Sequence, residues 1–346
     1  MPIGPPPPTG FTEAKPGDVL YGKLRPYLSK SLLVEEPTYA STELLCIRPA
    51  ADTTSRWLAY LVQSRPFLDW AVATSEGAKM PRTSWAKVGD FKCPGLALGE
   101  QRAIADFLDA ETARIDALIS KKRRLIELLD ERLGAEIRLT LRSLDVPSLP
   151  LRRKWRVVDC KHRTAAYVED GYPVVSPGDA TPGRLDLSRC HRFVDDADYL
   201  DLIEPPRQPR VGDIIYSRNA SIGIASYVDT ADPFCMGQDV CLITSDDQDQ
   251  LYLTYVLNSL GIDQLDEAKI GSTFSRINVA QILDLLIPWP EPSAQRQLAA
   301  QFDRIVTSHD RLRASLSRQI ELLVEHRQAL ITAAVTGETV VPGVAA

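Results

Sequence analysis

Three short polar loops carry the side chains best suited to chemistry in this chain of 346 residues. They contain Lys161, His162, Arg163 and Thr164, then Arg218, Asn219 and Ser221, and then Thr273, Ser275 and Arg276. An arginine can hydrogen-bond guanine O6 and N7 together, and an asparagine can do the same with adenine N6 and N7. Lysine, serine and threonine hold phosphate oxygens. These residue types favour DNA binding, although each loop taken alone fits a solvated turn equally well.

No catalytic motif accompanies these loops. Methyl transfer to an adenine amino group needs an N/D-P-P-F/Y loop with a glycine-rich cofactor turn, and a P-loop ATPase needs G-x-x-x-x-G-K-S/T; the sequence has neither. Residues 204–207, E-P-P-R, lack the stacking aromatic residue and are interpreted as a loop. The histidines, at positions 162, 191, 309 and 326, show no metal-ligand spacing. The sequence therefore predicts a binding protein with no metal and no cofactor of its own.

Two long amphipathic segments must position the loops. Residues 100–141 and 294–335 align without a gap, so that Gln101 matches Gln295 and Asp109 matches Asp303. Apolar residues recur three and four positions apart, which predicts long helices packed as a coiled coil. The expected seam is Ile104, Leu108, Ile115, Leu118, Leu125 and Leu129 on the first helix, and Leu298, Phe302, Ile305, Leu312, Leu316, Leu323 and Leu330 on the second. The alternative is that each helix lies along its own globular domain.

A second apolar line follows the first helix at Ile119, Ile126, Leu133 and Ile137. This line could dock a partner protein. It could equally widen the seam, because a buried helix face commonly covers about 100°. The sequence leaves both interpretations open.

The residues ahead of the two helices repeat as well. PGDVLY (16–21) returns as VGDIIY (211–216), and ELLCI returns as DVCLI, with Cys241 placed over Cys46. GAKMPR (77–82) returns as GSTFSR (271–276). Short apolar runs in both copies predict strands, and residues 56–69 predict one helix ending near Pro66. By this alignment the predicted DNA-binding set extends to Lys23, Arg25, Lys79 and Arg82 in the first copy.

The expected organisation is a tandem repeat of an α/β globule followed by a long helix. Its parts are a proline-rich segment (1–15), a first globule (16–99), the first helix (100–145), a second globule (146–293), the second helix (294–337) and a tail (338–346). About sixty residues (151–210) precede the GDIIY strand, whereas fifteen precede GDVLY. We therefore interpret the first globule as a truncated or degenerate copy.

The composition is 44% hydrophobic and 25% charged, which is typical of a soluble globular protein. No membrane span or secretion signal is evident, and six cysteines without a C-x-x-C motif are expected to be reduced thiols in the cytoplasm. The net charge of −6 argues against a wholly basic nucleic-acid binder. Acidic residues concentrate at 195–204 and 246–249, and those surfaces are expected to face away from any phosphate backbone.

These motifs together resemble the specificity subunit of type I restriction–modification systems. The resemblance rests on GDVLYGKLRPYL with STELLCIRP in the first copy, and on DCKHRTAAYVEDGYP with GDIIYSRNASIG in the second. It rests also on KMPRTSW and STFSRIN, each followed by a strand and a helix opening with Q-R, and it covers residues 16 to about 337. It implies two target-recognition domains, the first incomplete here, which read the halves of a bipartite DNA sequence. It also implies that the helices form an antiparallel coiled coil that sets the gap between the half-sites.

The resemblance further implies the partners, which are double-stranded DNA, adenine-N6 methyltransferase subunits docked on the helices, and ATP-driven restriction subunits. S-adenosylmethionine, ATP and Mg are expected on those partners, so this chain would not be an enzyme. Two positions depart from the family pattern, since Ala165 replaces the usual proline of K-H-x-T-P and Gly99 replaces an acidic residue. Three alternatives stay open, namely a truncated scaffold that binds methyltransferase subunits without reading DNA, a half-length subunit that dimerises, and a self-sufficient nuclease or methylase.

Overall fold

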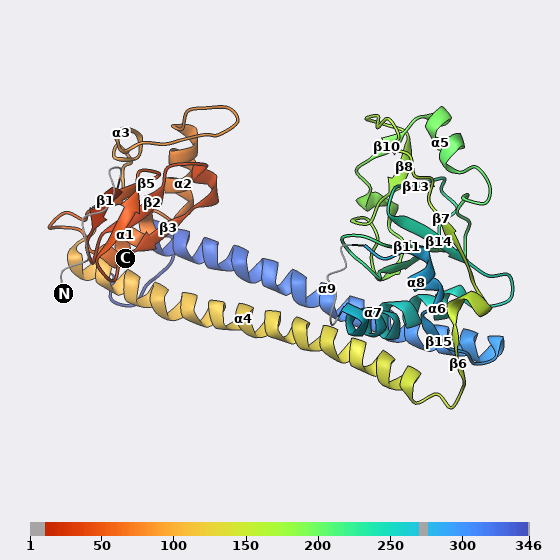
Figure 1. The fold of residues 1–346 in the computed structure, drawn as a ribbon. Coiled ribbons are helices and arrows are strands. Elements are labelled where there is room, and N and C mark those ends of the chain that lie inside the picture. The colour runs from red at the N-terminus through yellow and green to blue at the C-terminus, as the bar shows by residue number, and fades with distance from the viewer. Residues whose placement is uncertain (1–10, 270–275, 345–346) are drawn as a thin grey trace. The chain divides into compact units, whose positions relative to one another are not determined.

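The chain is a mixed α/β protein, and its computed structural model describes residues 11–269 and 276–344. It divides into two compact units (Figure 1). The first unit comprises Met1–Ile126 with Ala314–Ala346, and the second comprises Glu127–Arg313. Each unit therefore contains one globule and a part of both long helices. Among the described residues, no helix is both long and apolar enough to cross a membrane.

The first unit is built on a three-stranded antiparallel sheet. In this sheet β2 (Val19–Gly22) lies between β3 (Ser31–Leu33) and β5 (Leu44–Ile47), and β1 (Phe11–Ala14) pairs separately with β4 (Thr38–Ser41). The 3-10 turn η1 (Pro26–Leu28) and helices α1 (Ser55–Leu61), α2 (Arg65–Ala73) and α3 (Trp85–Val88) complete the globule. Its core forms where Tyr21 of β2 packs edge-on against Phe67 of α2, with 5.3 Å between ring centroids.

The second unit contains a five-stranded sheet in the order β7-β14-β11-β12-β9. These strands are β7 (Arg156–Asp159), β9 (Gly183–Arg184), β11 (Ile214–Ser217), β12 (Ala225–Tyr227) and β14 (Val240–Thr244). Smaller sheets join β8 (Tyr172–Val175) to β10 (Phe193–Val194) and β13 (Cys235–Met236), and β6 (Ser148–Pro150) to β15 (Leu286–Pro288). The helical elements are η2 (Leu151–Arg153), η3 (Leu187–Arg189), α5 (Asp196–Leu202), α6 (Gln250–Val256), η4 (Leu257–Gly261), α7 (Ile262–Lys269) and α8 (Val279–Leu283).

The repeat is visible in the strand pairing, because β3-β2-β5 and β12-β11-β14 have the same order and direction. Tyr21 pairs with Leu45, and its counterpart Tyr216 pairs with Cys241. Cys241 therefore corresponds to Leu45, and its placement over Cys46 was wrong by one residue. The connection before β14 is one residue longer than the connection before β5, which sequence matching of the two cysteines concealed. In the described part of the first unit, no strand takes the place of β7.

The repeated G-D pair forms the turn that starts the central strand of each sheet. Gly17 and Gly212 have φ angles of 94° and 96°, in the left-handed region that glycine adopts at least cost. The following carboxylates then accept hydrogen bonds from backbone N–H groups three residues earlier, Asp18 from Lys15 at 2.9 Å and Asp213 from Arg210 at 2.8 Å. Glycine and aspartate recur together because one allows the turn and the other closes it.

The long helices are α4 (Leu98–Arg142) and α9 (Pro292–Thr336), close to the predicted bounds. In the first unit, Ile104 of α4 shares a buried cluster with Ile331 of α9. In the second unit, Leu141 shares a cluster with Phe302. Since the start of α4 meets the end of α9 in one unit and the reverse holds in the other, the helices are antiparallel in each. The predicted coiled-coil pairing is confirmed within both units.

The seam itself differs from the prediction in its middle part. Leu118, Leu125 and Leu312 are 44–47% exposed, whereas Ile119 and Ile137 of the second apolar line are buried. Because an α-helix drifts about 20° per heptad, a strict heptad line leaves the seam and a four-residue step restores it. The second line is therefore part of a wider seam. Of the other predicted residues, Ile104, Leu108, Ile115, Phe302 and Leu316 are buried, and Leu129, Leu298, Ile305, Leu323 and Leu330 are half-buried.

Two smaller expectations were also wrong. The single helix expected over residues 56–69 is two helices, and Pro66 lies in the first turn of α2 rather than at a helix end. Proline is tolerated there because first-turn N–H groups have no partner within the helix. The strand β1 lies within the segment expected to be unstructured, where it pairs with β4. The rest of that segment, residues 1–10, lies outside the described residues.

A buried glutamine joins each long helix to its globule. Gln101 accepts a hydrogen bond from Thr54 N at 2.7 Å, just ahead of α1, and Gln295 accepts one from Asp249 N at 3.0 Å, just ahead of α6. Both glutamines are no more than 3% exposed, and each amide also donates to a backbone carbonyl of the loop before its helix. The glutamine of the repeated Q-R motif therefore acts as a clamp between the long helix and its globule.

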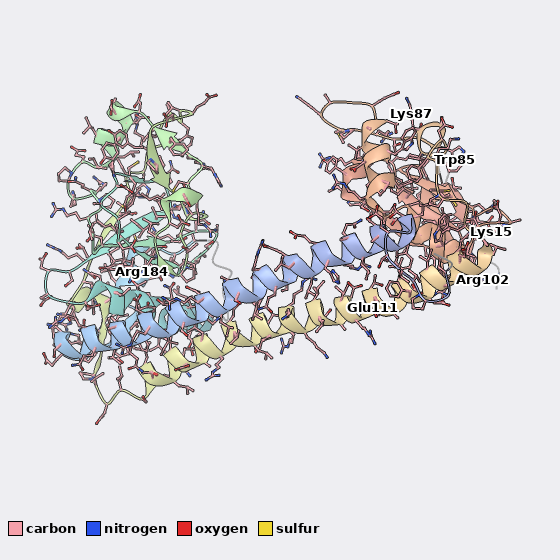
Figure 2. The ribbon with its side chains drawn as sticks, turned by 180° about the vertical axis from the view of Figure 1, so that it is seen from behind. Lys15, Trp85, Lys87, Arg102, Glu111 and Arg184 are labelled. Carbon is pink, nitrogen blue, oxygen red and sulfur yellow. The ribbon has the colours of Figure 1, made fainter. Side chains whose placement is uncertain are left out.

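A tyrosine and an aspartate form a second attachment about two turns further along each long helix. Tyr60 of α1 donates to Asp109 at 2.6 Å, and Tyr255 of α6 donates to Asp303 at 3.1 Å. Asp303 also pairs with Arg184 at 2.9 Å, and Figure 2 shows Arg184 beside α9. The repeated residues of the long helices thus fix a globule to a rod at two points in each unit.

We predict that Gln295→Ala lowers the free energy of unfolding of the second unit by about 1–3 kcal/mol, because it leaves buried backbone groups without partners. Gln297→Ala is the matched control, since Gln297 lies on the same helix turn and is exposed. Urea denaturation followed by circular dichroism measures both changes. Equal stability of the two variants would contradict the role of the clamp.

Candidate nucleic-acid interface

The polar loops of the second unit meet at one end of its large sheet. Strands β7 and β11 both pair antiparallel with β14, so they run parallel and end at the same edge. Lys161 follows β7 and Arg218 follows β11. Asn219 forms an antiparallel bridge with Arg276, which brings the third loop alongside. Thr273 and Ser275 lie outside the described residues.

The first unit has the same backbone contacts around its polar loops, an arrangement that we call the loop frame. Lys23 N donates to Glu43 O at 2.9 Å, as Arg218 N does to Asp239 O at 2.9 Å. Leu24 forms an antiparallel bridge with Arg82, as Asn219 does with Arg276. These backbone contacts place Lys23 at the position of Arg218 and Arg82 at the position of Arg276, as the sequence repeat predicts.

A guanidinium occupies the same place in both frames and pairs with an acidic residue of the neighbouring strand end. Arg276 lies 2.9 Å from Asp239, and Arg82 pairs with Glu43. The two arginine side chains are 44% and 53% exposed. An exposed ion pair of this kind contributes little to stability, so a phosphate or a base edge can replace the carboxylate at small cost.

Arg218 differs from the other predicted contact residues because it is only 4% exposed. Its guanidinium pairs with Asp159 and donates to Ile277 O at 3.3 Å. In this position Arg218 ties the ends of β7 and β11 to the third loop. Its predicted contact with DNA stays a prediction, and Lys23, whose ammonium group donates to Thr42 O at 2.7 Å, is more accessible.

The acidic run at residues 195–204 lies directly on the basic loop that follows β7. Asp201 of α5 pairs with Lys161 at 2.5 Å and with Arg163 at 2.6 Å, and Glu204 lies 3.2 Å from Lys161. Hydrogen bonds from these two cations lower the pKa of Asp201. The acidic run thus lies on a loop that is predicted to bind DNA, and the expectation that it faces away from any phosphate backbone stays a prediction. Its carboxylates occupy the donors that phosphates would need.

Helix α5 is fixed in this position by its own polar groups. Asp195 caps the helix by accepting a hydrogen bond from Asp198 N at 2.9 Å. Asp198 in turn accepts from Ala166 N at 2.9 Å and pairs with Arg163. Tyr199 stacks on Tyr172 of β8, with 3.9 Å between ring centroids. The acidic helix is an ordered part of the loop cluster and not a loose surface run.

The remaining predicted residues lie around the same loops. Thr164 accepts a hydrogen bond from Gln238 at 2.8 Å, and the Asn219 amide donates to Asp239 at 3.2 Å. Ser221 is half-buried, whereas Arg25 and Lys79 are exposed. Arg25 N donates to Pro81 O at 2.7 Å, which holds the two predicted loops of the first unit together.

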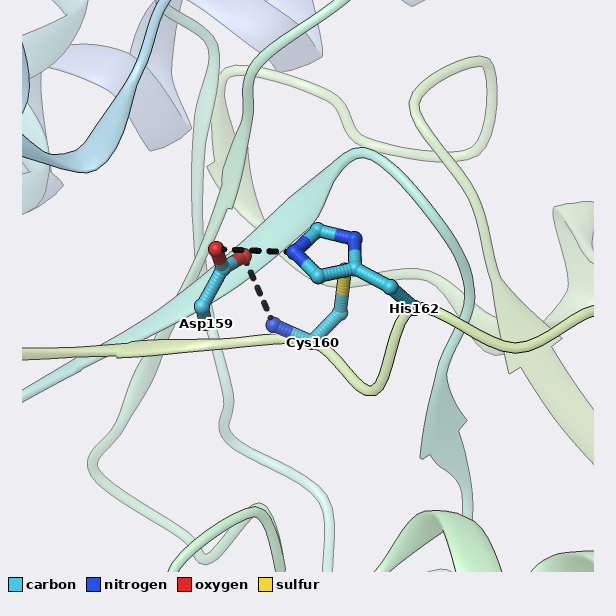
Figure 3. A group of neighbouring side chains, drawn as sticks. All are labelled: Asp159, Cys160 and His162. Atoms are coloured by element: carbon cyan, nitrogen blue, oxygen red, sulfur yellow. Dashed lines mark hydrogen bonds and ion pairs between the residues drawn. The ribbon is translucent and has the colours of Figure 1, made fainter.

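Asp159, Cys160 and His162 bring three potential metal ligands within 4.8 Å of one another (Figure 3), a grouping that the sequence analysis missed. The His162 ring nitrogen lies 3.2 Å from Asp159. Asp159 is already paired with the Arg218 guanidinium, and burial raises the pKa of the Cys160 thiol. A cation would have to displace Arg218 and ionise a buried thiol. The grouping is better suited to holding the Arg218 side chain than to binding a metal.

The comparisons with known proteins agree with the sequence resemblance. Residues 167–322 match the family described as Type I restriction modification DNA specificity domain. No curated protein sequence matches the chain.

Two solved structures share its fold. A chain from "Structural basis underlying complex assembly and conformational transition of the type I R-M system" has a TM-score of 0.78 and 19% identity, over 96% of this chain and 85% of that chain. The HsdS subunit from Thermoanaerobacter tengcongensis has a TM-score of 0.54 and 18% identity, over 96% of this chain and 84% of its own. At these identities the likeness establishes the fold alone.

We predict that Asp201→Asn strengthens binding to DNA of arbitrary sequence, because it removes the one carboxylate that Lys161 and Arg163 share, although each keeps its pair with Glu204 or Asp198. The slope of log K against log salt should become steeper by about 1–2. Asp232→Asn is the control, since it removes the same charge from an exposed site away from the loop. Fluorescence anisotropy at several salt concentrations measures both variants. Equal slopes for Asp201→Asn and Asp232→Asn would remove α5 from the interface.

Proposed function

Since the chain carries a type I restriction–modification DNA specificity domain at residues 167–322, we propose that it is the DNA-recognition subunit of a type I restriction–modification complex. The observation that carries this proposal is the loop frame shared by both units, in which Arg82 and Arg276 occupy one equivalent position. A pair of similar readers suits a bipartite target on double-stranded DNA. Each unit would read one half of the target.

In this mechanism the antiparallel helices act as a ruler. The buried glutamine and the tyrosine–aspartate pair attach each globule to its helix, so the helix length would set the gap between half-sites. Arg276 and Asn219 would exchange their contacts with Asp239 for contacts with DNA. An arginine fork on guanine or an asparagine amide on adenine would then supply sequence discrimination of about 1–3 kcal/mol per good pair.

Catalysis in this proposal belongs to partner subunits. Adenine-N6 methyltransferase subunits would bring S-adenosylmethionine, and restriction subunits would bring ATP and Mg. A docking surface in the first unit is supported by exposed apolar residues of the helices, namely Leu118 and Leu125 on α4 and Leu322 on α9. This surface replaces the Ile119 line of the sequence analysis, because that line is buried in the seam.

One observation favours a second function, that of a scaffold that binds methyltransferase subunits without reading DNA. In the described part of the second unit, Lys161, Arg163, Arg218 and Arg276 are all paired with carboxylates of the same unit. A surface neutralised in this way has little attraction for phosphate unless the ion pairs exchange. DNA binding by the assembled complex distinguishes the two functions.

We predict that Arg276→Glu lowers the DNA affinity of the complex reconstituted with methyltransferase subunits by at least about tenfold and reduces its salt slope by about 1. Arg153→Glu is the control, because Arg153 is an exposed residue of η2, ahead of β7 and outside the loops and the long helices. Gel-shift titration at several salt concentrations measures both. Unchanged affinity and slope for Arg276→Glu would exclude this loop, and a complex that assembles but binds no DNA would support the scaffold.

We also predict that Leu118→Asp with Leu125→Asp abolishes copurification of the methyltransferase subunits, because both leucines are about half exposed and would face the partner. Leu200→Asp is the control, since Leu200 of α5 is 64% exposed and lies away from the helices. Circular dichroism verifies folding of each variant. Full copurification of the double variant would place the docking surface elsewhere.

A further inference from the structure

The repeated aspartate of the G-D turn has a different partner in each unit. In the first unit, Asp18 is 2% exposed and accepts two parallel hydrogen bonds from Arg48, at 2.9 Å from Nε and at 2.7 Å from Nη2. This guanidinium holds the pKa of Asp18 well below its usual range. A buried carboxylate needs such compensation, because burying an unpaired charge is strongly unfavourable.

In the second unit, threonine takes the place of that arginine. Val19 pairs with Ile47 in the first unit as Ile214 pairs with Ile243 in the second, so Thr244 stands where Arg48 stands. Asp213 is 7% exposed, and its hydrogen-bond partners are the Arg210 N–H and the Thr244 hydroxyl. Among the described residues it has no ion pair, and burial raises its pKa.

Two arginines act on Asp213 through their charge, but neither forms an ion pair with it within the described residues. Arg156 of β7 lies opposite Thr244 in the strand register, but its guanidinium pairs with Asp246 at 3.0 Å. Arg210 contributes its backbone N–H to Asp213, and its side chain has no ion pair within the described residues. The second unit therefore keeps the buried acid of the repeat and lacks its guanidinium.

Asp213 lines a cavity of about 690 Å³, within the range of small-molecule sites. Its apolar lining includes Val157, Leu242, Pro205 and Pro206, and its charged lining includes Arg152, Arg156 and Arg210 together with Asp246. Asp213 precedes β11 and Arg156 begins β7, so the cavity lies at the end of the sheet opposite the polar loops. It is thus separate from the candidate nucleic-acid interface.

The chemistry of an occupant follows from these groups. Asp18 of the first unit, which accepts two parallel hydrogen bonds from Arg48, shows that a carboxylate at this position is suited to a pair of N–H donors. Arg152 and Arg156 already pair with Asp284 and Asp246, whereas Arg210 has no ion pair within the described residues and disfavours a second cation. The donors should therefore belong to a neutral group, and an anionic group that pairs with Arg210 should accompany it. The base edge of guanine presents N1–H and N2–H side by side, its flat ring fits between apolar walls, and its phosphate can pair with arginine.

We propose that this cavity binds a guanine nucleotide, with the base on Asp213 and the phosphate on Arg210 and its neighbouring arginines. The site is independent of DNA reading, and it gives this chain a small-molecule ligand of its own. Asp213 is the residue that distinguishes the base, and the arginines supply affinity without selecting among nucleotides.

The test is calorimetric titration of the full chain with GMP. The decisive variant is Thr244→Arg, which restores the arginine of the first unit and places a guanidinium on Asp213. It should raise the melting temperature and weaken GMP binding at least tenfold. Ala231→Arg adds the same charge to an exposed position of the same unit, outside the cavity, and should leave GMP binding unchanged.

Two further ligands separate the base from the phosphate. AMP and inorganic phosphate should each bind at least tenfold more weakly than GMP, because neither offers paired N–H donors to Asp213. Equal binding of AMP and GMP would overturn the role of Asp213. Failure of GMP to bind the unmodified chain, or equal binding to Thr244→Arg, would overturn the site itself, and neither result bears on DNA recognition.

Discussion

The fold depends on the buried hydrogen bonds that attach each globule to a long helix. A helix can position a recognition loop only if the globule that carries the loop is fixed to it. Gln101 and Gln295 make this attachment with amides that are no more than 3% exposed, and Tyr60 and Tyr255 repeat it further along the helices. Polar groups are directional, and leaving one unpaired inside the protein is costly. They therefore fix the orientation of the globule more closely than apolar contacts alone would.

The polar loops of the second unit do not form a bare basic patch. Asp159, Asp201 and Asp239 neutralise most of the cationic side chains in these loops. This internal neutralisation fits the net charge of −6 and explains how a protein with basic loops can be acidic overall. Contact with a phosphate requires exchange of one ion pair for another. Under the proposed function, sequence-independent attraction would then be weak, and hydrogen bonds to base edges would decide where the protein stays.

Much of this could be predicted from the sequence, because repeats and helical periodicity are local signals. Residue spacing predicted the bounds of α4 and α9, the shared strand order and the match of Arg82 with Arg276. The exposure of Leu118 could not be predicted, because the drift of the seam depends on how the partner helix packs. Nor was the contact of Asp201 with Lys161, which joins residues forty positions apart through the fold. The absence of an arginine partner for Asp213 could not be predicted from the sequence. It follows from the strand register, which places Thr244 at the position that Arg48 has in the first unit.

The most direct test of the central account is hydrogen–deuterium exchange of the chain in a complex reconstituted with methyltransferase subunits, with and without DNA that carries the sequence which that complex methylates. The account predicts slower exchange at residues 23–25 and 79–82 in the first unit and at 161–164 and 218–221 in the second. Exchange near Gln101 and Gln295 should be slow in both states. Protection that leaves these loops unchanged and falls elsewhere on the chain would contradict it.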